Sequence, residues 1–92
     1  MLKVFNFKAE CTNAFITITL TFKIYSSYDA PHIAAVLKLV AENDGTFQHS
    51  MNEERRQRID ITVSPETLLL LKLQGHIDFK NIPDIPAYYF SE

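Results

Sequence analysis

The chain has one cysteine, two glycines and no long apolar run among its 92 residues, and each scarcity excludes a class of protein. Cys11 has no second thiol with which to form an internal disulfide, so a disulfide scaffold is excluded. Two glycines are too few for a glycine-rich phosphate loop. No apolar stretch approaches the roughly 18 residues of a membrane span, and no basic-then-apolar leader is present. We therefore expect a cytoplasmic protein.

The charge balance excludes a further class of partners. Nine basic residues against eleven acidic ones give a net charge of −2, which leaves no broad positive field for a nucleic-acid backbone. Apolar residues make up 47% of the chain, enough for one hydrophobic core at this length. We expect one domain that binds protein, with neither nucleic acid nor membrane as a partner.

Two neighbouring segments, residues 2–9 and 15–25, alternate as half-buried strands do. One side of the second segment carries Ile16, Ile18, Leu20, Phe22 and Ile24, and the other side carries Thr17, Thr19, Thr21 and Lys23. In the first segment the alternation places Phe5, Phe7 and Ala9 on one side and Leu2 and Val4 on the other. Residues 11–14 supply a turn, so the pair predicts a hairpin with a partly buried thiol at its turn.

The chain then changes to a helical period. The apolar residues at three-and-four spacing are Ile33, Val36, Leu37 and Val40. Asp29, followed by Ala30 and Pro31, predicts the N-cap, and residues 43–45 predict the stop. The pattern therefore indicates an amphipathic helix of about three to four turns, long enough to cover a small sheet.

The remaining segments are less regular. Residues 46–58 hold few apolar side chains and predict a surface loop or a short solvated helix. Residues 59–63 alternate and predict a third strand. After the cap signal at Ser64, the run 68–73 fits either a short buried helix or another strand, and we favour the helix. Residues 76–79 predict a last short strand.

The order strand, strand, helix, strand, short helix, strand is that of the β-grasp, an α+β fold in which a mixed sheet wraps one main helix. Residues 22–42 resemble the second strand and helix of the ubiquitin-fold modifier family, through the strand end Phe22-Lys-Ile24 and the helix sequence Ala35-Val-Leu-Lys38. The resemblance implies a ubiquitin-like β-grasp domain over residues 1–82. Residues 83–92, which contain two of the four prolines and an aromatic run, predict an extended tail.

The last residues of the sequence distinguish a covalent modifier from an interaction module that is not conjugated. Modifiers of that family are joined to their targets through a C-terminal glycine, whereas this sequence ends in Tyr89-Phe-Ser-Glu92 and its last glycine is Gly75. We therefore expect a non-enzymatic ubiquitin-like interaction module, or a small structural subunit of a larger assembly. The alternative is a divergent ubiquitin-fold-type modifier or a regulator of a conjugation pathway.

Reactive residues are scattered rather than grouped. The histidines, His32, His49 and His76, lack the spacing of metal ligands, and we expect His32 and His49 to be ordinary surface groups. No base stands beside Cys11 in the sequence to activate its thiol. We therefore expect no catalytic residue, metal site or cofactor.

Two segments are candidates for binding a protein partner. The basic run contributes Arg55, Arg56 and Arg58, although the adjoining Glu53 and Glu54 favour a solvated charge run as the alternative. The tail contributes Tyr88, Tyr89 and Phe90, which either fold back over the sheet or anchor in a partner. If the threonine side of residues 15–25 lay on an edge strand, strand addition would be a third route to association.

We predict that deleting residues 87–92 weakens partner binding with little loss of folding stability, because the deletion removes the aromatic anchor and leaves the predicted domain intact. Native affinity purification and a thermal melt of both proteins would check this. Unchanged retention of partners by the truncated protein would count against the tail as an anchor.

Overall fold

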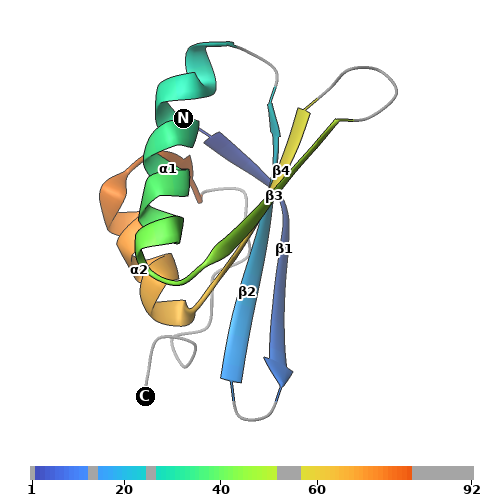
Figure 1. Ribbon diagram of the computed structural model, residues 1–92, viewed down its shortest axis with the longest axis vertical. Helices are drawn as coiled ribbons and strands as arrows, with labels where there is room; N and C mark the ends of the chain where they lie inside the picture. Colours follow the sequence, from blue (N-terminus) through green and yellow to red (C-terminus); the bar gives the residue numbers. More distant parts are fainter. Residues whose placement is uncertain (1, 13–14, 25–26, 52–56, 80–92) are drawn as a thin grey trace.

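A computed structural model of the protein describes residues 2–12, 15–24, 27–51 and 57–79. The elements in chain order are β1 (Leu2–Thr12), β2 (Phe15–Ile24), the short 3₁₀ turn η1 (Ser27–Asp29), α1 (Ala30–Glu42), β3 (Thr46–Met51), β4 (Gln57–Val63), α2 (Pro65–Gln74) and β5 (Ile77–Asp78). Both helices lie on one side of the sheet, and the β1–β2 hairpin extends beyond them (Figure 1). The predicted tail, residues 83–92, lies outside the described residues.

The described strands form one mixed sheet in the order β3-β4-β2-β1-β5. Neighbouring strands are antiparallel except for β1 and β5, which run parallel. The predicted α+β class and mixed sheet are confirmed. The order differs from the predicted one by an additional strand, β3, and it does not confirm the β-grasp.

The additional strand corrects one prediction. We expected residues 46–58 to form a loop or a short solvated helix, but Thr46–Met51 is a strand that pairs with β4 from Thr46↔Thr62 to Met51↔Gln57. Met51 pairs with Gln57, six positions later, so β3 is held by pairing with the next strand along the chain. The local sequence of β3 contains little of the β-branched and apolar alternation on which a strand prediction depends.

A β-bulge corrects the predicted faces of β1. Val4 pairs with Phe22, whereas Asn6 pairs with Thr21, so Phe5 is the extra residue. The extra residue reverses the alternation, and consequently the apolar residues before and after it face the helices together. Phe5 points away from them, and its ring lies 3.6 Å from the Nζ of Lys23.

The hydrophobic core lies between the sheet and the two helices. Its strand residues are Leu2, Ile18, Leu20, Phe22, Ile59, Ile61, Val63 and Ile77, and its helix residues are Val36, Val40, Leu68 and Leu71. The predicted face of α1 is confirmed, since Val36 and Val40 are fully buried and Ile33 and Leu37 pack against the core. The preferred helix over residues 68–73 is also confirmed as part of α2.

The helix ends agree with the sequence in three cases out of four. Ser64 caps α2 by accepting a hydrogen bond from the Thr67 amide at 3.2 Å, and Gly75 ends it in the left-handed conformation. The amides of Asn43 and Gly45 both donate to the Val40 carbonyl at the end of α1. Asp29 stands at the N-cap of α1 but makes no side-chain cap hydrogen bond, because it is the last residue of η1 and has helical backbone angles.

We predict that Gly45→Ala lowers the free energy of unfolding by about 1–3 kcal/mol, because there is no room for a side chain where α1 turns into β3. A Cβ at this position would lie 2.7 Å from Val40 Cγ1 and 3.0 Å from the Thr62 carbonyl oxygen. Urea denaturation would measure the loss.

The matched control is Gly75→Asn. Apart from its chain neighbours, no described residue has an atom within 4 Å of a Cβ at Gly75, and asparagine tolerates the left-handed backbone there. This control should cost less than about 1 kcal/mol. Equal losses in the two variants would mean that the close packing at Gly45 is not what requires glycine.

Candidate protein-interaction site

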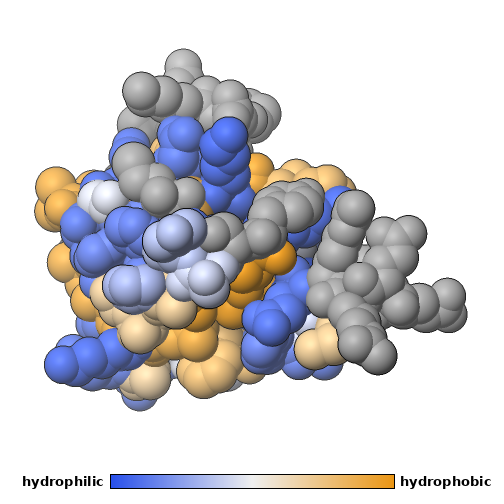
Figure 2. All heavy atoms as spheres, turned by 90° about the horizontal axis from the view of Figure 1, so that it is seen from above, coloured by the Kyte–Doolittle hydropathy of each residue, from blue (hydrophilic) through white to orange (hydrophobic). Residues whose placement is uncertain are grey.

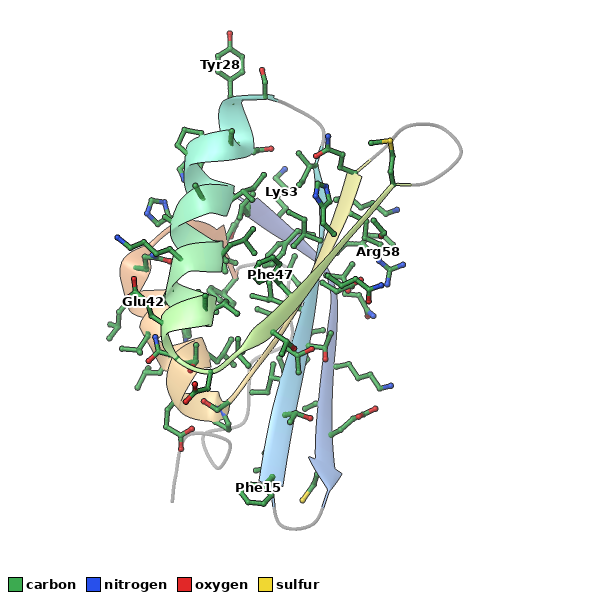
Figure 3. The ribbon with its side chains drawn as sticks, in the orientation of Figure 1. Lys3, Phe15, Tyr28, Glu42, Phe47 and Arg58 are labelled. Carbon is green, nitrogen blue, oxygen red and sulfur yellow. The ribbon has the colours of Figure 1, made fainter. Side chains whose placement is uncertain are left out.

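The strand β3 is the most open part of the described sheet. It lies at one end of the strand order, and all six of its residues are exposed. Phe47 is 48% exposed and Met51 60% exposed. In the register with β4, Phe47 pairs with Ile61 and Met51 pairs with Gln57. Both side chains therefore lie on the side of the sheet that the helices cover. In Figure 3, Phe47 points toward the helix side, whereas Arg58 lies on the other side of the sheet.

Edge strands of stable monomers usually carry charges, prolines or bulges that hinder pairing with another chain. β3 has none of these features: its sequence, Thr-Phe-Gln-His-Ser-Met, is uncharged and proline-free, and its register with β4 is unbroken. The other edge of the sheet, formed by β5 and β1, is different. β5 covers only the start of β1, and β1 carries a bulge and the ion pair Lys8–Glu10 at 2.6 Å. β3 is therefore the better edge for strand addition.

The Lys8–Glu10 pair is an exposed surface pair. The hydrogen bond from Lys8 to the Glu10 carboxylate, together with its charge, raises the pKa of Lys8. Both side chains are more than half exposed, so water and salt screen their attraction and the pair adds little to stability. Its effect is to place two charges on β1 near the sheet edge.

The threonine side of β2 does not lie at an edge. β2 is the central strand between β4 and β1, which corrects the conditional route of strand addition through Thr17, Thr19 and Thr21. The neighbouring strands use this side for a polar network instead. Thr21 is only 2% exposed and donates to Asp60 Oδ1 at 2.5 Å, while Thr19 and Thr62 share a hydrogen bond at 3.3 Å.

Arg58 is the one predicted partner-binding residue within the described part of the chain. It lies on β4, and its guanidinium donates to both Asp60 oxygens, with Nε 3.2 Å from Oδ2. This pairing reduces the charge that Arg58 could offer to a partner. The other predicted residues, Arg55, Arg56, Tyr88, Tyr89 and Phe90, lie outside the described residues.

A second apolar surface lies on α2. Leu68 and Leu71 are buried, whereas Leu69, Leu70 and Leu73 are exposed. Hydrophobic side chains also reach the surface among hydrophilic ones when the molecule is seen from above (Figure 2). Exposed leucines on one helix are common at protein interfaces. Unlike the edge strand β3, however, the middle of α2 has its backbone groups paired within the helix, so its exposed leucines offer side-chain contact only.

The structure places some of the reactive side chains differently from the sequence-based prediction. Cys11 is exposed within β1 rather than half-buried in a turn, and His49 lies on β3 rather than in a loop. His32 and His76 meet, with their Nδ1 atoms 2.8 Å apart. Within the described ranges, no group of three or more histidine, cysteine, aspartate or glutamate side chains is placed to hold a metal ion.

Sequence reasoning missed both β3 and the His32–His76 pair as candidate functional features. The only local signal for β3 was the spacing of Phe47, His49 and Met51 at every second position. The two histidines are 44 residues apart, so no spacing rule could have joined them.

Comparison with protein-family models, curated proteins and solved structures found no match. The resemblance of residues 22–42 to the ubiquitin-fold modifier family therefore stays a prediction. Neither α1 nor α2, the helices in the described part of the chain, is long and apolar enough to cross a membrane.

We predict that Thr21→Val lowers the free energy of unfolding by about 1–2 kcal/mol, because a buried hydroxyl that donates to a carboxylate is lost while the branched shape is kept. Thr17→Val, on the same side of β2 but exposed, should change it by less than about 0.5 kcal/mol. Chemical denaturation of both variants checks this. If Thr21→Val left the free energy of unfolding unchanged, the hydrogen bond from Thr21 to Asp60 would add nothing to stability.

Proposed function

We propose that the protein is a non-enzymatic protein-interaction module, or a small subunit of a larger assembly, that binds an extended segment of its partner along β3. The observation that carries the proposal is the exposed and uncharged edge formed by Thr46–Met51. Strand addition needs a free edge of this kind, since the backbone supplies most of the hydrogen bonds. The partner is then a polypeptide with a short run of β-forming residues.

Side chains on β3 give the proposed contact its selectivity. A strand presents alternate residues to one side, so Phe47, His49 and Met51 face the helix side together. An added strand that places apolar residues beside Phe47 and Met51 would remove more of their surface from water. Gln48 and Ser50 on the other side offer polar contacts only. We expect a partner strand that is apolar on the side facing α1 and polar on the other.

The narrower prediction of a ubiquitin-like β-grasp remains part of this proposal and rests on the resemblance of residues 22–42. Docking along β3 does not depend on it. The contributions of Arg55, Arg56 and the aromatic run Tyr88 to Phe90 also remain proposals, as additional contacts beside the strand edge.

We predict that Phe47→Lys reduces the amount of partner retained in native affinity purification about tenfold or more, because it replaces an apolar anchor with a charge on the edge strand. The matched control is Phe15→Lys, at the end of the β1–β2 hairpin, where the ring is 74% exposed (Figure 3). It makes the same chemical change on a different surface. Thermal melts of both variants establish that each is folded.

The outcomes separate the alternatives. Loss of partners with Phe47→Lys but not with Phe15→Lys supports binding at β3. Equal retention by both folded variants would remove β3 as the binding site. A parallel purification under denaturing conditions tests the modifier alternative, since only covalent conjugates survive as mass-shifted species.

A further inference from the structure

We propose that His32 and His76 form a binding site for a divalent transition-metal ion of the class that takes imidazole ligands, such as Zn²⁺, Ni²⁺ or Cu²⁺. The two Nδ1 atoms lie 2.8 Å apart, and the ring centroids lie 5.1 Å apart with the rings tilted by 60°. The rings therefore approach each other through these two nitrogens rather than through stacked faces. The structure thus brings two ligand atoms of the same kind together from distant parts of the chain.

Both Nδ1 atoms can serve as metal ligands if the histidine that donates from Nδ1 changes tautomer and carries its proton on Nε2 instead. A hydrogen bond between two imidazole nitrogens needs one proton, donated by one Nδ1 and accepted by the lone pair of the other. With metal–nitrogen bonds of about 2.0 Å, two ligands at a right angle lie about 2.8 Å apart, and two tetrahedral ligands lie about 3.3 Å apart. The observed separation is thus within about half an ångström of both geometries. A small turn of the rings would direct both lone pairs at one ion.

The backbone around the two histidines is held in place by hydrogen bonds. His76 follows Gly75, and its carbonyl accepts a hydrogen bond from the Leu2 amide at 2.9 Å. The side chain of Gln74 donates to the Ala35 carbonyl at 3.2 Å, which ties the end of α2 to α1. His32 lies in the first turn of α1. The two ligands are therefore partly preorganised, and binding a metal ion would cost little conformational entropy.

Solvent reaches both imidazoles, which are only partly buried. In the described part of the chain, the two histidines are not joined by a third histidine, cysteine or acid in a metal-binding group. Water would complete the coordination, as in sites that keep open positions, and the ion would exchange readily. Such a site would act by joining the start of α1 to the α2–β5 connection when the metal is present.

The test is a thermal melt of the full chain with increasing NiCl₂ or ZnCl₂, compared with the same chain in EDTA. An ion that binds only the folded state should raise the Tm by about 4–8 °C once its concentration reaches roughly five times the Kd. NMR of the histidine ring protons under the same titration should move the signals of His32 and His76 together.

The third histidine supplies the matched control. His49→Gln, on β3, should keep the metal-dependent rise in Tm, whereas His32→Gln and His76→Gln should each lose at least four-fifths of it. Cys11→Ser should behave like His49→Gln, which separates the pair from thiol binding. Melts in EDTA show whether each variant is folded.

Two results would overturn the proposal. One is a metal-dependent rise that persists in folded His32→Gln and His76→Gln, which would place the site elsewhere. The other is no shift of Tm or ring signals in the wild-type chain up to millimolar metal, which would leave the pair as a hydrogen bond between two side chains.

Discussion

The strict alternation of β2 is the constraint on which the rest of the structure depends. Its aliphatic side must be covered, and α1 and α2 cover it from one direction. Its threonine side faces away from the helices and forms hydrogen bonds with side chains of β4. Thr21 shows the result, since it is 2% exposed although it lies on the side without helices. At Thr21, therefore, β2 is closed to water on both of its surfaces, whereas Thr17 on the same side is exposed.

The two surfaces of β2 are stabilised by different forces. On the helix side, Ile18, Leu20 and Phe22 gain stability from burial of apolar area, which requires no particular direction. On the other side, Thr21 and Asp60 form a hydrogen bond that fixes the position of β4 across from β2. The first force holds the layers together, and the second helps to fix the register. Slippage by one residue would place isoleucines in the polar network and threonines in the core.

The sequence predicted those elements whose own side chains require burial. β2 and α1 each contain enough periodic apolar residues to define a buried face, and α2 was placed by its apolar run together with the cap signal at Ser64. β3 was missed because its stability comes from pairing with β4, and its six exposed residues carry no pattern that a core would impose. The faces of β1 were misread because a single bulge at Phe5 reverses the alternation. Features that arise between distant segments were beyond any local rule, as the pairing of His32 with His76 illustrates.

The parallel pairing of β1 with β5 has a consequence for how the protein is made. Leu2 pairs with Ile77, and both are 3% exposed, so the first described strand is completed by one of the last. The hairpin of β1 and β2 is local and can form while the ribosome is still translating. Its edge at Leu2 stays open until residue 77 has been synthesised, since no earlier described segment occupies that position. Closure of the sheet therefore waits for nearly the whole domain, which favours folding after release of these residues over stepwise folding during synthesis.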